Sequence, residues 1–211
     1  MRRLPVYFLL DTSGSMYGEP IQALNNALSG MFSALRSDAQ ALDSLWVSLI
    51  TFDRTVNEIC PLTELALFQL PEIYCPQSGP THTGMALELL YDKVKSELIL
   101  GSENQKGDWK PLLFIFTDGK PNDIQKYREM IPKIKAVNFG AIICCAAGHM
   151  ADDSILKELT NDVVHLDSAD SHTLKQFFKW VSDTIEQGNK SQGTGEKVAL
   201  PPPPSEVHLV I

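Results

Sequence analysis

Residues 6–15 read VYFLLDTSGS, in which a run of apolar residues leads at once into an acidic, hydroxyl-rich segment with one glycine. A short apolar run bounded by polar residues predicts a buried strand over Val6–Leu10. Residues 111–119 read PLLFIFTDG, which predicts another buried strand over Pro111–Thr117 that also leads into a carboxylate. Continuous apolar strands are typical of parallel sheets covered on both faces. These two stretches therefore predict an α/β fold with acidic residues at the carboxyl ends of its strands.

The rest of the chain alternates between helical and extended patterns. Apolar residues at helical spacing predict helices over Pro20 to about Ser37, Thr83–Leu98, Asn122–Val137, Ser154–Thr160 and Ser171–Gln187. Short apolar runs predict further strands over Leu45–Phe52, Val56–Cys60, Ala141–Ala147 and Val163–Leu166. Pro132 should kink or split its helix, and the tight turn before Val56 predicts an antiparallel hairpin. We expect a three-layer, doubly wound, mostly parallel sheet with one short antiparallel edge strand and helices on both faces.

The composition changes after Gln187. Gly188–Gly195 is rich in glycine, serine, asparagine and lysine, which predicts a flexible linker. Pro201–Pro204 is a run of prolines and should be extended as polyproline II. Val207–Ile211 is apolar, so it is either an unordered tail or a strand that adds to an exposed sheet edge. We expect residues 1–187 to form one domain and residues 188–211 a flexible linker with a proline-rich apolar tail.

Charge and hydropathy argue against several classes of protein. The formal net charge of −8 would repel polyphosphate, and no basic stripe with interleaved aromatic residues offsets it, so nucleic acid is not an expected partner. No stretch approaches the roughly 18 apolar residues of a membrane span. Met1-Arg2-Arg3 superficially resembles the opening of a signal peptide, but Asp11 interrupts the short apolar run that follows. We therefore expect a cytoplasmic protein without a membrane span.

The cysteines fit a reducing compartment. Cys144 and Cys145 adjoin inside a predicted strand, where free buried thiols are expected. The absence of any C-x-x-C pair makes a zinc site improbable. A bridge between Cys60 and Cys75 would need an oxidising compartment.

Oxygen-bearing side chains gather at the carboxyl edge of the predicted sheet. Asp11, Ser13 and Ser15 alternate by two in the first motif, Thr81 precedes a helix, and Asp118 follows a later strand. Carboxyl ends of parallel strands form the binding edge of such folds. Two adjacent buried carboxylates would repel each other and lose hydration, and a divalent cation removes both costs. Because Mg²⁺ prefers about six oxygen ligands, these side chains predict a Mg²⁺ site, with Mn²⁺ or Ca²⁺ as alternatives.

A cation held by only two carboxylates would stay electrophilic. An Asp or Glu from a protein partner would complete its shell, so we expect a docking point for an acidic residue. Tyr17, Glu19, His82 and Thr83 lie near the motifs and are the expected rim of that surface, although Tyr17 and Glu19 also fit solvated loop positions. Thr83 is also the rival of Thr81 as a ligand, but its place beside the helix favours an N-cap. The alternative for all the hydroxyls is that they cap helices and turns.

The motifs resemble the metal-ion-dependent adhesion site of von Willebrand factor type A (VWA) domains. Asp11, Ser13 and Ser15 match its Asp-x-Ser-x-Ser element, Thr81 in Gly-Pro-Thr-His-Thr-Gly matches its threonine element, and Asp118 in Thr-Asp-Gly matches its last element. The resemblance covers about residues 4 to 187. It implies that the serines usually ligate the cation directly and that the aspartates often act through water. The sequence departs from the family where Pro80 replaces a common second glycine.

The segment Val-Tyr-Phe-Leu-Leu-Asp-Thr-Ser-Gly-Ser-Met and the early start of the first strand resemble more closely the TerY-like VWA proteins of bacterial tellurium-resistance and stress-response gene clusters. Such proteins are cytosolic and are often encoded beside a PP2C-type phosphatase and a protein kinase, which this resemblance makes candidate partners. It implies a non-enzymatic, Mg²⁺-bridged docking role in stress response or phosphorylation signalling.

Two other functions compete with this interpretation. An Asp after the first strand also begins the Asp-x-Asp motif of haloacid-dehalogenase phosphotransferases, but Ser13 stands where the second acid would be. No histidine base beside a nucleophile and no glycine-rich phosphate loop is visible in the sequence. A metal-independent structural scaffold is the third possibility, and EDTA would then change neither partner binding nor melting temperature.

Overall fold

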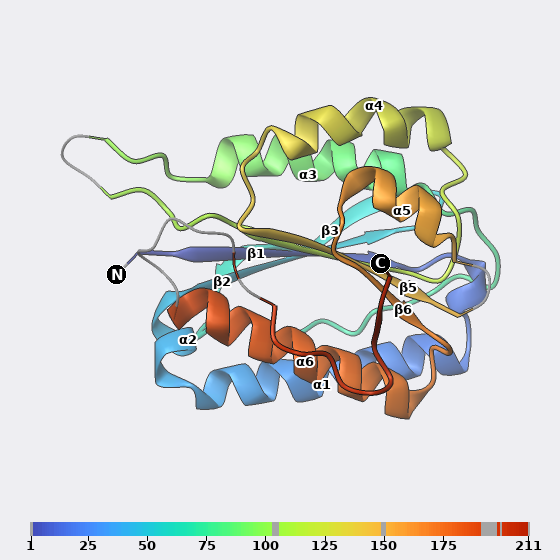
Figure 1. The fold of residues 1–211 in the computed structure, drawn as a ribbon, viewed down its shortest axis with the longest axis horizontal. Coiled ribbons are helices and arrows are strands. Elements are labelled where there is room, and N and C mark those ends of the chain that lie inside the picture. The colour runs from blue at the N-terminus through green and yellow to red at the C-terminus, as the bar shows by residue number, and fades with distance from the viewer. Residues whose placement is uncertain (1, 103–105, 149–150, 191–197, 199, 211) are drawn as a thin grey trace.

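A single sheet separates two layers of helices in the computed structural model, which describes residues 2–102, 106–148, 151–190, 198 and 200–210 (Figure 1). Its strand order is β3-β2-β1-β4-β5-β6-β7. The strands are β1 (Leu4–Asp11), β2 (Leu45–Phe52), β3 (Val56–Glu64), β4 (Leu112–Thr117), β5 (Ala141–Ala147), β6 (Val163–Leu166) and β7 (His208–Leu209). Parallel pairing joins β2, β1, β4, β5 and β6, whereas β3 and β7 pair antiparallel at the two edges.

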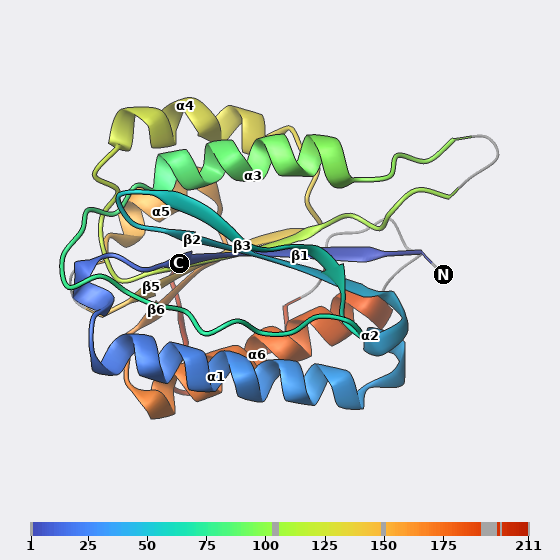
Figure 2. The same cartoon turned by 180° about the vertical axis from the view of Figure 1, so that it is seen from behind.

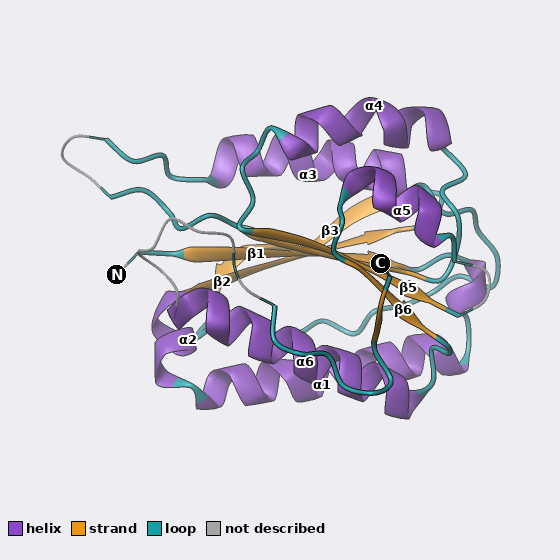
Figure 3. Ribbon diagram, viewed as in Figure 1, coloured by secondary structure: helices purple, strands orange, loops and turns teal. Residues whose placement is uncertain are grey.

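The helices cover both faces of this sheet, as Figure 3 shows. One layer contains α1 (Glu19–Ser37), α2 (Ala39–Ser44) and α6 (Ser171–Lys190). The other contains α3 (Thr83–Glu97), α4 (Ile124–Lys135) and α5 (Asp153–Leu159), and a short 3-10 helix, η1 (Gly14–Met16), follows β1. This arrangement confirms the three-layer, mostly parallel α/β fold expected from the sequence.

Strand β1 is formed by apolar and aromatic residues from Leu4 to Leu10, because helices cover both of its faces, and it ends in the charged residue Asp11. Val6, Phe8 and Leu10 pack into the core beneath α1 and α6, while Tyr7 and Leu9 pack into the core beneath α3 and α4. Side chains of a strand alternate between faces, so a strand covered by helices on both sides is expected to be apolar on both faces over the covered length. This explains why β1 shows a continuous run rather than an alternating pattern.

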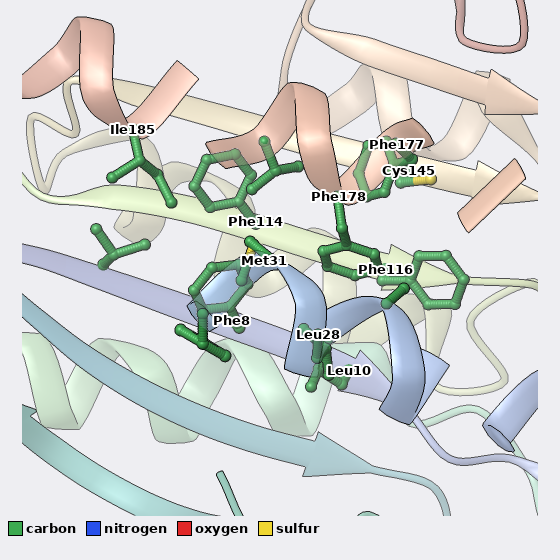
Figure 4. Close-up of a cluster of buried hydrophobic side chains, with 14 of the residues drawn as sticks. Phe8, Leu10, Leu28, Met31, Phe114, Phe116, Cys145, Phe177, Phe178 and Ile185 are labelled. Atoms are coloured by element: carbon green, nitrogen blue, oxygen red, sulfur yellow. The ribbon is translucent and has the colours of Figure 1, made fainter. Parts of the chain in front are cut away.

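Aromatic packing fixes the two strands that carry the acidic motifs. The rings of Phe8 on β1 and Phe114 on β4 are stacked with centroids 5.2 Å apart. Phe177 and Phe178 of α6 lie over Phe116 of β4, with centroid separations of 6.4 and 6.1 Å (Figure 4). Offset and tilted ring pairs add to the stability gained from burial alone. The positions of Asp11 and Asp118 therefore rest on a well-packed aromatic core.

The C-terminal tail adds a strand to the sheet of its own chain. Leu209 pairs with Val164, and His208 pairs with His165, so β7 covers the outer edge of β6. Upstream of β7, the indole Nε1 of Trp180 on α6 donates to the carbonyl oxygen of Pro201 at 2.9 Å. Of the two alternatives for the tail, the structure shows the intramolecular strand. Of the predicted linker Gly188–Gly195, residues 188–190 belong to the end of α6, and residues 191–195 lie outside the described residues.

Several boundaries differ from those predicted. Strand β3 continues to Glu64, and α6 continues to Lys190. Helix α2 was not predicted. Asp38 is its N-cap, and the Asp38 carboxylate accepts from the backbone N–H of Ala41 at 2.7 Å. Helix α4 continues through Pro132 instead of splitting, because the proline is exposed near the end of the helix and its carbonyl still accepts from Ala136.

The connection from β3 to α3 runs along α1 toward the carboxyl edge of the sheet (Figure 2). The side-chain amide of Asn25 on α1 holds this connection by donating to the carbonyl of Ile73 and accepting from its N–H, both at 2.9 Å. Within the described ranges, none of the helices combines the length and apolar character needed to cross a bilayer. All four cysteines are free thiols.

We expect the tail to contribute measurably to stability through Val207, which is only 2% exposed. Val207→Ala should lower the free energy of unfolding by about 2 kcal/mol, because it removes buried methyl groups and leaves a cavity. Leu209→Ala is the control, since Leu209 is 43% exposed and surface changes usually stay within about 0.5 kcal/mol. Urea unfolding would check this, and equal effects of the two substitutions would contradict the buried role of Val207.

Candidate metal centre

The acidic motifs lie at the point where the chain reverses its direction across the sheet. Strands β1 and β4 are parallel neighbours, and they end at Asp11 and Thr117. The connection after β1 leads toward β2, and the connection after β4 leads toward β5 on the other side. Helices α1 and α4, which follow these strands, cover opposite faces (Figure 1). Ligands of doubly wound sheets bind at such a switch point, outside the carboxyl ends of the strands.

Asp11 is a fully buried carboxyl group. Its Oδ1 accepts from the backbone N–H of Ser13 at 2.7 Å, and its Oδ2 accepts from Thr117 Oγ1 at 2.5 Å. Burial raises the pKa of Asp11 to about 6, although both hydrogen bonds act to lower it, and the nearby charge of Asp118 adds to the rise. The hydrogen bonds therefore orient this carboxylate but do not compensate for its loss of hydration.

Asp118 joins the motif after β4 to the motif after β1. Ser15 Oγ donates to Asp118 Oδ1 at 2.8 Å, and the hydroxyl oxygens of Ser13 and Ser15 are 3.3 Å apart. Burial raises the pKa of Asp118, while the hydrogen bond from Ser15 acts to lower it. Ser13, Ser15 and Asp118 thus present their oxygen atoms to one small region.

Thr81 reaches the same region from the loop before α3. Its hydroxyl oxygen lies 3.1 Å from where a Cβ on Gly119 would be, so it sits directly beside the turn that carries Asp118. Asn122 holds Thr81 in place, because its Oδ1 accepts from the Thr81 N–H at 2.6 Å and its own N–H donates to the Thr81 carbonyl at 2.8 Å. Asn122 was not among the predicted site residues, although Pro121-Asn122 is a turn signal.

A close approach between two loops explains the glycine of the first motif. A Cβ on Gly14 would lie 2.7 Å from the Cα of Ser78, and the Gly14 N–H donates to the Gly79 carbonyl at 3.3 Å. The same loop brings Cys75 Sγ within 3.0 Å of the Ser13 carbonyl, to which it donates. Burial and then the charges of nearby aspartates raise the pKa of the Cys75 thiol to about 11. Cys75 is therefore a neutral donor that positions the first motif.

The expected rim residues have different environments. Tyr17 and Glu19 are exposed near the first motif. His82 is half-buried, and its Nδ1 lies 3.1 Å from the carbonyl oxygen of Arg54. Thr83 is fully buried, and its hydroxyl has no hydrogen-bond partner among the described residues. A partner at the surface would therefore not reach Thr83.

The cap expected from Thr83 is provided by another residue. Asp123, which begins α4, accepts from the N–H groups of Gly84 and Met85 at 3.0 and 2.8 Å. A Cβ on Gly84 would lie 2.3 Å from the backbone nitrogen of Tyr127, so α3 and α4 meet closely at this point. The expectation that Thr83 caps α3 was wrong, because the carboxylate of a neighbouring helix satisfies these donors instead.

The residues present fit a hard divalent cation. In the part of the chain that the structure describes, no lysine, arginine or histidine pairs with Asp11 or Asp118; the nearby Lys120 pairs with Asp152 at 3.0 Å. The described residues also contain no group of three or more His, Cys, Asp or Glu side chains arranged to hold a metal ion. The donors are thus two carboxylates and neutral hydroxyls, an all-oxygen set that suits Mg²⁺, Mn²⁺ or Ca²⁺ better than a thiolate-preferring metal.

Comparison with known proteins assigns the family. A family model described as the von Willebrand factor type A domain matches residues 6–188. The chain belongs to the von Willebrand factor type A domain family. This VWA match includes every predicted oxygen ligand. None of the curated proteins compared with the chain matches it.

Solved structures agree on the VWA fold. One is proximal thread matrix protein 1 from the mussel byssus, in a structure described as having a zinc occupied MIDAS (metal-ion-dependent adhesion site) motif. It is 19% identical to this chain with a TM-score of 0.64, and the match covers 86% of this chain and 48% of that chain. A von Willebrand factor type A protein from Catenulispora acidiphila is 15% identical with a TM-score of 0.67 over 88% of this chain and 43% of that chain. The chain thus spans less than half the length of these two proteins, and at such identities the likeness shows the fold.

Gly14 and Gly30 allow a matched test of the close loop approach. Gly14→Ala should lower the free energy of unfolding by about 1–3 kcal/mol, because its Cβ would meet backbone atoms. Gly30→Ala, inside α1 with nothing within 4 Å of the added Cβ, should raise stability by up to about 1 kcal/mol. Urea unfolding of both variants measures this, and a Gly14→Ala protein as stable as wild type would show that the loops are not tightly apposed.

The raised pKa of Asp11 predicts a pH dependence in the metal-free protein. An unfolded aspartate has a pKa near 3.9, so the native state with a pKa of about 6 binds more protons between these values. Stability in EDTA should therefore fall as pH rises from about 4 through about 6, by on the order of 3 kcal/mol from this group. Asp11→Asn should lose this dependence and be more stable than wild type at pH 7. If the free energy of unfolding changed with pH in the same way in both proteins, the raised pKa of Asp11 would be refuted.

Proposed function

We propose that the protein is a non-enzymatic docking module that uses a divalent cation to bind an acidic residue of a partner protein. The observation that supports this most directly is the pair of buried carboxyl groups, Asp11 and Asp118, which converge without a basic partner among the described residues. Ser15, which donates to Asp118, is exposed, so the site opens to the surface. A buried anionic pair that faces solvent on one side suits a cation with a position left for an outside ligand.

The five predicted ligands share one role in this proposal. Asp11, Ser13, Ser15, Thr81 and Asp118 would hold Mg²⁺, with Mn²⁺ or Ca²⁺ as alternatives. When bound, the cation would supply the positive charge that attracts a carboxylate. The protein's own contribution is preorganisation, because Thr117 orients Asp11 and Asn122 fixes Thr81 before any partner arrives. Side chains already held in position lose less entropy on binding.

The finer assignment follows the resemblance to the TerY-like VWA proteins. We place the protein in a bacterial tellurium-resistance, stress-response or phosphorylation-signalling system, with a cytoplasmic location. A PP2C-type phosphatase and a protein kinase encoded nearby are the candidate partners. The first-motif segment noted above supports this assignment.

The geometry gives less support to phosphotransfer. A haloacid-dehalogenase site needs a second acid two residues after the first, and Ser13 occupies that position. His82, the nearest histidine in the motifs, directs Nδ1 toward the Arg54 carbonyl instead of a hydroxyl nucleophile. A general base must lie within hydrogen-bond reach of the group it deprotonates.

Metal dependence can be measured without knowing the partner. Mg²⁺ at a hundredfold excess over its dissociation constant should raise the free energy of unfolding by about 2.7 kcal/mol relative to EDTA. Asp118→Ala should abolish this increment while the protein still folds. Asp183→Ala, at an exposed position on α6, is the control and should keep it. An unchanged stability of wild type in Mg²⁺ and EDTA would favour the metal-independent scaffold.

The same proteins test partner capture and enzymatic activity. Immobilised wild type should retain the purified phosphatase or kinase in Mg²⁺ and release it in EDTA, and Asp118→Ala should retain neither. Retention by Asp118→Ala would contradict cation-bridged docking. Phosphate release from a generic phosphomonoester that Asp11→Ala abolishes would instead favour an enzyme.

A further inference from the structure

Two exposed tyrosines lie on segments that contact the first motif of the candidate metal centre. Tyr17, at the end of η1, is 52% exposed, and Tyr74, in the connection from β3 to α3, is 75% exposed. Tyr17 follows Ser15 by two positions, and Tyr74 precedes Cys75, which donates to the Ser13 carbonyl. We call Tyr17 and Tyr74 the aromatic rim. Exposed large side chains are common one at a time, but two on segments that contact the same binding motif suggest contact with a ligand.

The backbone of the rim is held firmly on both sides of Tyr74. Asn25 of α1 makes two hydrogen bonds of 2.9 Å to the backbone of Ile73. Cys75 Sγ, one residue beyond Tyr74, donates to Ser13 at 3.0 Å. Rigid tyrosines give a large contact area at a low entropy cost, which is why they are frequent in binding surfaces. The backbone on both sides of Tyr74 is thus fixed, and its ring is exposed to solvent.

Tyr17 is tied to the same loop. Its backbone N–H donates to the Gly14 carbonyl at 3.2 Å, which fixes it to the first motif. Its hydroxyl oxygen lies 3.4 Å from Nε2 of Gln77, three residues after Tyr74. The two tyrosines therefore lie on segments that contact each other and the first motif.

The charges around the rim restrict what can bind there. Glu19 is exposed after Tyr17, and Glu72 accepts a hydrogen bond of 2.7 Å from the Tyr74 hydroxyl. Asp53 lies against the loop, with its Cβ 3.7 Å from where a Cβ on Gly79 would be. With a formal net charge of −8 for the whole chain, these groups would repel a run of acidic residues. One carboxylate can be attracted by the cation, but its neighbours in the partner must be uncharged.

We propose that the aromatic rim selects partner segments in which a single Asp or Glu is flanked by large apolar or aromatic side chains. This rests on the proposed cation-dependent docking and adds the chemistry of the partner segment. The carboxylate would face the cation, and the flanking side chain would pack on Tyr74 or Tyr17. Desolvated aromatic contacts near the centre of an interface carry most of its binding energy.

Three dye-labelled peptides test the inference by fluorescence anisotropy in Mg²⁺ and in EDTA. The first carries Asp between glycines, the second carries Asp between leucine and tryptophan, and the third is a run of five aspartates. In Mg²⁺ the second should bind wild type about tenfold more tightly than the first, and the third should bind no better than the first. Tyr74→Ser and Tyr17→Ser should reduce or remove this difference while the protein keeps its stabilisation by Mg²⁺.

Leu67→Ser is the matched control, because Leu67 is 73% exposed but lies far from the metal centre. It follows Leu65, whose N–H donates to the carbonyl of Leu45 at the amino-terminal end of β2, whereas the metal centre lies at the carboxyl ends of the strands. It should bind all three peptides as wild type does. Equal Mg²⁺-dependent affinity for the first two peptides, or tightest binding of the aspartate run, would overturn the rim proposal alone. Failure of every peptide to bind in a Mg²⁺-dependent way would overturn cation-dependent docking itself.

Discussion

Asp11 and Asp118 bring two buried carboxyl groups together at a site that opens to solvent beside Ser15. Burial raises the pKa of both, and no basic side chain in the described part of the chain offsets their charge. Among the described residues, the donors that contact them are hydroxyl and backbone groups, and such donors stabilise a carboxylate less than a full opposite charge does. Much of the surrounding structure serves to keep this unfavourable pair in a fixed geometry, which is the arrangement expected of a functional site.

The sheet and the helix contacts supply that fixed geometry. Strands β1 and β4 are adjacent and share the aromatic cluster of Phe8, Phe114 and Phe116, so the ends of the two strands cannot separate easily. Close contact of α3 and α4 at Gly84 keeps the loop of Thr81 near the turn after β4. The site is therefore made of short loops on a rigid scaffold, an arrangement in which small displacements of the scaffold would alter every ligand at once.

The sequence predicted the layers and the oxygen set because both depend on local patterns. Apolar runs of strand length followed by Asp-x-Ser-x-Ser and Thr-Asp-Gly identify the strands and their carboxyl ends from residues close in sequence. The supporting residues were not predictable in this way, since Asn122, Asp123 and Cys75 act on segments that lie about 40 to 60 positions away. Thr83 was misassigned for the same reason, because a carboxylate from α4 took the role that its own position suggested. The end of α6 and the pairing of β7 likewise depend on packing between distant segments.

The pairing of β7 with β6 has a consequence for how copies of this chain meet each other in concentrated solution. A strand at the edge of a sheet offers a row of unpaired backbone donors and acceptors to any neighbouring molecule. Very short edge strands are one way in which proteins avoid such association. Here Val163 and Val164 of β6 already pair with the tail of their own chain, and the two-residue β7 forms the edge of the described sheet on that side. The tail thus works as a built-in guard against edge-to-edge aggregation.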